Sequence, residues 1–146
     1  MKLITDNRRG MHGYKILDKY ECGMVLQGWE VKSARANTVN LQNSYCFFRK
    51  GELFLYNALF KSYMLEKNDE TRERKLLMHK KELIRLNSKL DKLGNGTIIP
   101  TKLYFTPTSK IKIEIALVVG MSKSDKREEI KAKDNELYLK KIKQYY

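Results

Sequence analysis

The sequence contains few of the residues from which catalytic and metal sites are built. Among 146 residues there are two histidines and two cysteines. His12 and His79 lie outside any HExxH pattern, and no GxSxG or GxxxxGK(S/T) motif occurs. Cys22 and Cys46 are too far apart in the chain for the paired spacing of zinc ligands. The sequence therefore predicts a protein that is not an enzyme, with no catalytic residue, no metal and no cofactor.

Long apolar segments are also missing. The longest uninterrupted apolar run, Ile115 to Val119, has five residues, whereas a transmembrane helix needs about 20. The first nine residues lack the apolar stretch of a secretory signal. We therefore expect a cytoplasmic protein without a membrane partner. Its cysteines are expected to be reduced, buried and inert thiols in strands.

Basic residues are abundant. Lys and Arg number 30 against 17 Asp and Glu, which gives a net charge of +13. A small chain with this charge is expected to bind a polyanion, either nucleic acid or an anionic membrane surface. The lack of a strongly amphipathic helix argues against the membrane. The basic residues form five clusters: Arg8 and Arg9, Lys32 and Arg35, Arg72 to Lys75, Lys80 and Lys81, and Lys123 to Arg127.

Alternating apolar and polar residues predict six short strands. The first ten residues are polar and are expected to be mobile. Lys50-Gly51 predicts a hairpin, and three phenylalanines, Phe47, Phe54 and Phe105, are predicted to lie in the core. Trp29 either packs in the core or stacks on bases. The predicted strands are Tyr14 to Glu21, Met24 to Val31, Tyr45 to Arg49, Glu52 to Phe60, Ile98 to Phe105 and Lys110 to Val119.

A helix is predicted between the strand groups. Leucines recur at helical spacing from about Thr71 to Leu93, and Gly94 and Gly96 follow. Strands with one inserted helix predict a mainly β fold, a small closed OB-like barrel with a capping helix. We expect this barrel to occupy residues 1–120. Residues 121–146 carry eight basic and five acidic residues without an apolar stripe, which indicates a basic C-terminal tail, helical when bound.

Three ordered blocks of the chain resemble the SmpB family, the protein partner of transfer-messenger RNA in bacterial ribosome rescue. The resemblance extends roughly from Asn7 to Asp134. The blocks are LQGWEVKSAR from Leu26, followed by Asn40-Leu41 and Ser44-Tyr45; RKLLMHKKEL from Arg74; and Ile99-Pro100 through Leu117, with Asp125-Lys126-Arg127 beyond.

The resemblance implies a barrel fold and an RNA-binding adaptor that holds the tRNA-like domain of transfer-messenger RNA. Glu21 is then expected to accept hydrogen bonds from base amino groups or to fix a neighbouring arginine. Arg35 is expected in a loop, and Leu77 either supports RNA contact or packs. With the basic cluster around Lys32, the candidate RNA-binding residues are His12, Glu21, Lys32, Arg35, Asn40, Leu77, His79 and Lys80.

The resemblance also implies that the tail occupies the empty messenger channel of a stalled ribosome, with the protein bound as a monomer. The chain departs from the family pattern at Gly13, Met121, Ser122 and Ser124. An alternative is a general single-strand nucleic-acid-binding barrel, and an RNA-processing enzyme is a third class. The candidate ribosome-binding residues are Gly120, Lys123, Asp125, Lys126, Arg127, Lys131 and Lys133.

Overall fold

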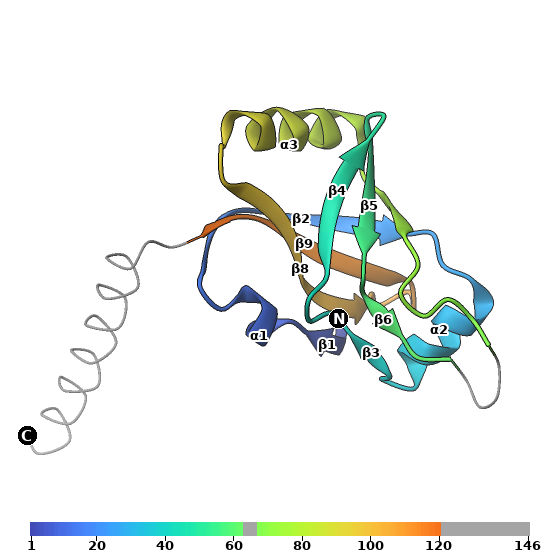
Figure 1. Cartoon of the computed structure of the whole chain (residues 1–146). Helices are drawn as coiled ribbons and strands as arrows, with labels where there is room; N and C mark the ends of the chain where they lie inside the picture. Colours follow the sequence, from blue (N-terminus) through green and yellow to red (C-terminus); the bar gives the residue numbers. More distant parts are fainter. Residues whose placement is uncertain (63–66, 121–146) are drawn as a thin grey trace, which may run out of the picture.

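Strands dominate the computed structural model, which describes residues 1–62 and 67–120 (Figure 1). No helix in this part of the chain is long and apolar enough to cross a membrane. In chain order the elements are β1 (Lys2–Asp6), α1 (Arg8–Met11), β2 (Tyr14–Met24), α2 (Gly28–Arg35), β3 (Val39–Asn40), β4 (Tyr45–Arg49), β5 (Glu52–Tyr56), β6 (Leu59–Phe60), β7 (Arg74–Leu77), α3 (Lys80–Lys92), β8 (Gly96–Phe105) and β9 (Ile111–Gly120).

Six of these strands close into a barrel. The order β8-β4-β5-β7-β2-β9 returns to its start because β9 also pairs with β8. β1 extends the sheet beside β8, while β3 and β6 form a separate two-stranded sheet. Closure satisfies the backbone groups that a free sheet edge would expose. The predicted mainly β barrel with an inserted helix is confirmed; the tail, predicted to be helical when bound, lies outside the described residues.

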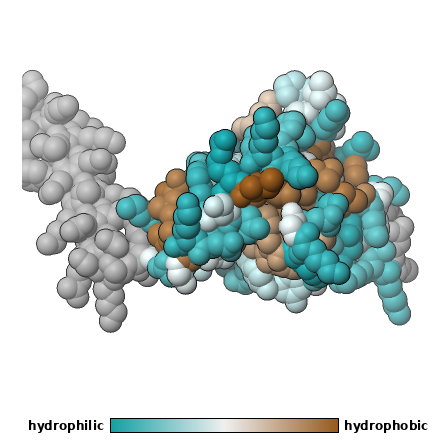
Figure 2. Space-filling model, turned by 90° about the horizontal axis from the view of Figure 1, so that it is seen from above, coloured by the Kyte–Doolittle hydropathy of each residue, from teal (hydrophilic) through white to brown (hydrophobic). Residues whose placement is uncertain are grey.

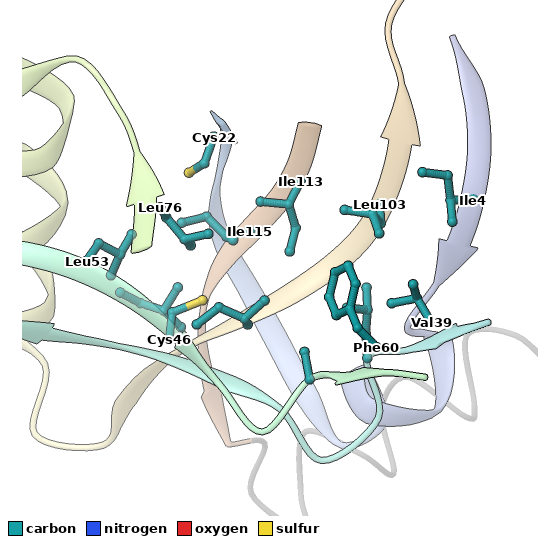
Figure 3. Close-up of a cluster of buried hydrophobic side chains, with 14 of the residues drawn as sticks. Ile4, Cys22, Val39, Cys46, Leu53, Phe60, Leu76, Leu103, Ile113 and Ile115 are labelled. Carbon is teal, nitrogen blue, oxygen red and sulfur yellow. The ribbon is translucent and has the colours of Figure 1, made fainter. Parts of the chain in front are cut away.

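The long strands of the barrel follow from sequence alternation. In β9, Ile113, Ile115 and Leu117 are buried and point into the main core, while Lys112 and Glu114 lie on the other face. The predicted strands in β4, β8 and β9 are confirmed, and β2 continues to Met24. The predicted strand from Glu52 to Phe60 is divided: β5 ends at Tyr56, Asn57 has a positive φ, and Leu59 and Phe60 form β6 in the other sheet. Figure 3 shows the resulting core, to which strands from the whole barrel contribute; its labelled residues are Ile4, Cys22, Val39, Cys46, Leu53, Phe60, Leu76, Leu103, Ile113 and Ile115.

The N-terminal segment is ordered, so the prediction that the first ten residues are mobile is wrong. β1 pairs with β8, and Ile4 is buried in the main core. The Asn7 amide donates to the Pro100 carbonyl at 2.7 Å, and its backbone N–H donates to Thr101 at 2.8 Å. Met11 packs on a small second apolar cluster outside the barrel. The polar composition of this segment did not predict these contacts, because most of them are backbone hydrogen bonds that any residue can make.

The helix α3 lies across one end of the barrel (Figure 1). Leu86 of this helix is fully buried in the main core, and Leu83, Leu90 and Leu93 pack against the same core. The helix begins at Lys80, whereas the sequence predicted a start near Thr71. The residues before it form β7, whose Leu76 pairs with both β5 and β2. The capping helix is confirmed, but its predicted first turns are strand.

Residues 28–35 form the helix α2, so the predicted strand from Met24 to Val31 is wrong. Gln27 is the N-cap, and the Glu30 carboxylate accepts a hydrogen bond from its backbone N–H at 2.7 Å. The indole N–H of Trp29 donates to the Gln27 side chain, and the Trp29 ring packs partly buried against the core. This local capping overrides the short apolar run before it.

A buried ion-pair network joins α2 to β7. The fully buried Glu30 carboxylate accepts from the guanidinium groups of Arg72 and Arg74. Arg74 also donates to the Ala58 carbonyl at 2.7 Å and lies 4.1 Å from the Phe60 ring centre. The cluster Arg72 to Lys75 was one of five basic clusters that together predicted a polyanion partner. Both of its arginines pair with Glu30, because buried charges require paired partners, and of the two only Arg74 is fully buried.

The aromatic core prediction is only partly correct. Phe105 packs against the main core, as predicted. Phe47 and Phe54 lie on the outer face of the β4–β5 hairpin, where their rings stack with centroids 5.8 Å apart. The inward positions of the hairpin belong to their neighbours, including the buried Leu53 and Leu55. A one-residue change of register decides which side chains face the core.

Candidate nucleic-acid interface

A cleft of about 760 Å³ lies where β2, the β7–α3 junction, α3 and β9 meet. Figure 2 looks down on the α3 end and shows mostly hydrophilic side chains, with hydrophobic side chains exposed in several places between them. The cleft is open to solvent and has acidic, basic and apolar groups in its walls. Its lining residues are Asp18, Lys19, Tyr20, Glu21, Gly23, Leu77, Met78, His79, Glu82, Arg85, Lys89 and Lys112.

Three of the predicted RNA-binding residues converge on this cleft. Glu21 comes from β2, Leu77 ends β7, and His79 is the N-cap residue of α3. Cross-strand pairing of Gly23 with Leu77 brings the first two segments together. The Leu77 side chain is 49% exposed, which favours contact with a ligand over the alternative of packing. Lys80, the exposed first residue of α3, is adjacent in the chain to His79.

The other predicted body residues do not line the cleft. His12 is exposed at the C-cap of α1, before β2. Lys32 and Arg35 are exposed on α2; Arg35 ends this helix, so its predicted loop position is wrong. Asn40 ends β3, and its side chain accepts from the Gln42 backbone N–H at 2.8 Å. The candidate set therefore divides between the cleft and other surfaces.

Several cationic residues of the cleft were not singled out by the sequence. Lys19 lies two positions before Glu21 on β2, and Lys112 reaches over Gly23, where an added Cβ would lie 3.5 Å from its Nζ. Arg85 and Lys89 follow each other at helical spacing on α3. The sequence predicted this helix from its apolar residues. The spacing of four residues between Arg85 and Lys89 could have shown that both lie on one polar face of it.

The Lys89 side chain fastens α3 to β2. Its ammonium donates to the Asp18 carboxylate at 2.5 Å, and the Tyr20 hydroxyl donates to the same oxygen at 2.7 Å. The hydrogen bonds from Lys89 and then from Tyr20 hold the pKa of Asp18 below its usual value. The charge of Lys89 is thus already paired. Lys19, Arg85 and Lys112 supply the remaining positive charge of the cleft.

The Glu21 carboxylate accepts a hydrogen bond from the hydroxyl of Tyr104 on β8. Among the described residues no arginine forms a hydrogen bond or an ion pair with it, and the alternative that it fixes a neighbouring arginine stays a prediction. Burial, followed by the Glu21 hydrogen bond, raises the pKa of Tyr104. The phenol therefore stays protonated at neutral pH and remains a donor.

A second surface, the aromatic patch, lies on the outer face of the β4–β5 hairpin. It comprises Tyr45, Phe47, Phe54 and Tyr56, with the Arg49 guanidinium 4.5 Å from the centre of the Phe54 ring. Tyr45 and Tyr56 are 43% and 41% exposed. Cross-strand pairing already brings the four rings together, which stabilises the hairpin.

The two cysteines are buried free thiols, as predicted from their strand positions. Burial raises the pKa of Cys22 to about 12, and burial also raises the pKa of Cys46. Thiols in this state are poor nucleophiles. Within residues 1–62 and 67–120 no three His, Cys, Asp or Glu side chains group as metal ligands would.

Gly120 is the exposed last residue of β9. The other candidate ribosome-binding residues, Lys123, Asp125, Lys126, Arg127, Lys131 and Lys133, lie outside the described residues. The prediction that they contact the ribosome therefore rests on the sequence alone.

Known proteins resemble the chain over nearly its whole length. The sequence profile of the SmpB protein family matches residues 4–145. An SsrA-binding protein of Mycoplasmopsis fermentans is 72% identical over 142 residues, 97% of each chain. The SsrA-binding protein of Mycoplasmopsis agalactiae is 64% identical, covering 100% of this chain and 99% of its own.

A solved structure described as "tmRNA-SmpB: a journey to the center of the bacterial ribosome" has a similar fold. It superposes with a TM-score of 0.68 at 38% identity, and the match covers 86% of this chain and 93% of the other. Sequence profile, full-length relatives and fold agree: the chain belongs to the SmpB family.

Proposed function

We propose that this protein is an adaptor that binds the tRNA-like domain of transfer-messenger RNA and delivers it to stalled ribosomes for trans-translation. The cleft between β2 and α3 is the RNA-binding site. The observation that carries the proposal is the convergence of Glu21, Leu77 and His79 on this cleft. Family membership supports it, because the relatives are described as SsrA-binding proteins.

The chemistry of the cleft suits a folded RNA rather than a bare polyanion. Lys19, Arg85 and Lys112 provide charges for phosphates, while Glu21 would repel them. A carboxylate at such a site is useful where it accepts from the amino group of a base. Leu77 adds an exposed apolar contact for a sugar or base. This mixture selects a surface where phosphates and base edges occur in a fixed arrangement.

The body and the tail divide the work at Gly120. Residues 1–120 hold the RNA, and residues 121–146 occupy the empty messenger channel beyond the decoding site. The tail has a net charge of +3, from eight basic and five acidic residues. A channel filled with intact message excludes it, which distinguishes a stalled ribosome from a translating one. The protein works in the cytoplasm as a bound monomer and performs no chemical step itself.

The aromatic patch favours a second candidate, a general single-strand nucleic-acid-binding barrel. Exposed rings such as Tyr45 and Tyr56 can stack on unpaired bases whatever their sequence. A protein of this kind binds an unstructured RNA as tightly as a folded one. The cleft predicts the opposite preference.

The test compares affinity for the tRNA-like domain with affinity for an unstructured RNA of equal length across a salt series. We expect tighter binding of the folded RNA at every salt concentration. For each tenfold rise in salt concentration, the logarithm of the association constant should fall by roughly 0.7 to 0.9 per phosphate neutralised. Lys112→Ala should weaken binding of the folded RNA. Lys110→Ala, two positions away in an exposed turn, is the matched control. Equal affinities for both RNAs would favour the general binder.

Recovery of the RNA that copurifies with the tagged protein is an independent test. The proposed function requires transfer-messenger RNA to dominate that fraction. Labelled RNA incubated with the protein should remain intact, since the proposal includes no cleavage.

A further inference from the structure

Tyr104 is a buried tyrosine whose hydroxyl reaches the cleft without lining it. Its side chain is 4% exposed, and its strand position on β8 lies opposite Lys112 on β9. Glu21 lies on β2, one strand further along the barrel, opposite Glu114 of β9. The Tyr104 hydroxyl therefore passes over β9 to donate to the Glu21 carboxylate. An aromatic side chain can make such a diagonal reach across a sheet.

The Glu21 carboxylate needs a hydrogen-bond donor because a second carboxylate lies beside it. Glu114 stands directly opposite, and like charges at paired positions of a sheet repel each other. Glu114 is itself held by the Thr101 hydroxyl at 2.5 Å and lies 4.0 Å from the Lys102 ammonium. Each carboxylate thus has its own hydroxyl donor on β8. These donors fix the two carboxylates in separate positions.

We propose that Tyr104 is a positioning residue for RNA recognition: its hydroxyl holds the Glu21 carboxylate at the cleft edge so that the remaining lone pairs accept from the exocyclic amino group of an RNA base. This inference rests on the proposed RNA-binding function of the cleft. Glu21 is exposed, so without a partner its carboxylate would move among several side-chain rotamers. A fixed acceptor loses less conformational entropy when the base binds than a mobile one.

The position of Tyr104 in the sheet makes the hydroxyl separable from the ring. Lys102, on the same strand, places its ammonium 5.8 Å from the ring centre, and Leu3 of β1 pairs with Tyr104. These contacts involve the ring and the backbone, and both remain in phenylalanine. Tyr104→Phe therefore removes the hydrogen bond to Glu21 while it preserves the packing.

The experiment is a double-mutant cycle measured as binding to a transcript of the tRNA-like domain. The proteins are the wild type, Tyr104→Phe, Glu21→Ala, which removes the acceptor, and the double variant, at about 50 mM salt so that weak variants still bind. Tyr56→Phe, which removes an exposed hydroxyl of the aromatic patch, is the control. Thermal unfolding of each protein records any loss of stability.

We expect Tyr104→Phe to weaken binding about tenfold, because the Glu21 side chain must then lose its rotamer freedom when the base binds. In the Glu21→Ala background the same substitution should change affinity less than about twofold, because the acceptor that it positions is gone. Tyr56→Phe should bind as the wild type does. The unfolding temperature of Tyr104→Phe should stay near that of the wild type.

Two results would overturn the inference. Wild-type affinity for Tyr104→Phe would show that the hydroxyl has no part in binding. Equal losses in both backgrounds would show that Tyr104 acts on the RNA site through packing, and not through Glu21. Failure of the proposed function gives a different result, since the wild type itself would then not prefer the tRNA-like domain to an unstructured RNA.

Discussion

The substitution Glu30→Gln should test whether the buried network is what holds α2 on the barrel. Glu30 is fully buried and accepts from two guanidinium groups and from the Gln27 backbone N–H. Glutamine has nearly the same size, so the helix can keep its packing. It removes the negative charge and places an amide nitrogen or a neutral oxygen against Arg74.

The magnitude follows from the position of Arg74. Its side chain is 0% exposed, and burial lowers the pKa of its guanidinium, which the hydrogen bond and charge of Glu30 oppose. Removing one partner of such a buried pair costs about 3–5 kcal/mol, since the other charge stays buried without compensation. Arg74 keeps its bonds to the Ala58 and Glu70 carbonyls, so we expect about 3 kcal/mol. A domain of this kind has only about 5–15 kcal/mol in total.

Urea unfolding followed by circular dichroism measures the loss. With a slope of about 2 kcal/mol/M, the midpoint of Glu30→Gln should fall by roughly 1.5 M. Glu73→Gln is the matched control, because Glu73 pairs with Arg49 at 2.9 Å on the surface, where the side chains are 37% and 52% exposed. That pair should contribute less than about 1 kcal/mol. Equal midpoint shifts in the two variants would refute the assigned role of the network.

Three further perturbations test other parts of the molecule. Asp18→Asn should lower the unfolding midpoint near neutral pH, because the hydrogen bond from Lys89 lowers the pKa of Asp18 in the folded state; the difference from the wild type should vanish as acid protonates Asp18 at a pH below the ordinary pKa of an aspartate. A difference that persists in acid would contradict this. Leu86→Ala should cost about 2–5 kcal/mol, whereas Ile84→Ala, 60% exposed on the same helix, should cost little in the same denaturation assay. Truncation after Gly120 should leave RNA affinity nearly unchanged but abolish peptide tagging on ribosomes stalled without downstream message; full tagging would exclude the tail's proposed role.

The barrel could be predicted because its signals are local. Alternation in the last strand records which side chains face the core, and Lys50-Gly51 marks a hairpin whose two residues both have positive φ. The capping helix was equally visible in its leucine spacing. The failure at its start, near Thr71, is instructive. Leu76 fits the helical pattern of the later leucines, yet its burial comes from pairing with β5 and β2.

The error at α2 has a different physical cause. Three apolar residues before Gln27 suggest a continuing strand, and Glu30 then looks like an exposed polar position. Its partners Arg72 and Arg74 lie 42 and 44 residues further along the chain. No local pattern reports that a glutamate is buried against arginines so distant. The burial of Arg74 in the cluster Arg72 to Lys75 was missed for the same reason, since charge counted along the sequence does not separate interior from surface.

Family resemblance identified some residues of the candidate site, but it did not identify the contacts between them. The resemblance supplied Glu21, Leu77 and His79, which the fold brings to one cleft. It did not supply the contacts that shape the cleft. Lys89 meets Asp18 across 71 residues, and Tyr104 meets Glu21 across 83. Contacts of this kind appear only when the barrel closes.

Selectivity and charge must reside largely in different parts of this protein. Three cations of the cleft, Lys19, Arg85 and Lys112, are not paired with Asp18. They are a small part of the positive charge of residues 1–120, whose net charge is +10 once the +3 of the tail is subtracted from +13. Each phosphate contact contributes less than one unit to the salt slope. A single substitution in the cleft should therefore alter affinity and preference for folded RNA while it changes the salt slope by less than one unit. Charge spread over the rest of the surface sets that slope and attracts RNA of any structure. In the proposed function the cleft, with its acceptor at Glu21 and its apolar contact at Leu77, then decides which RNA remains bound.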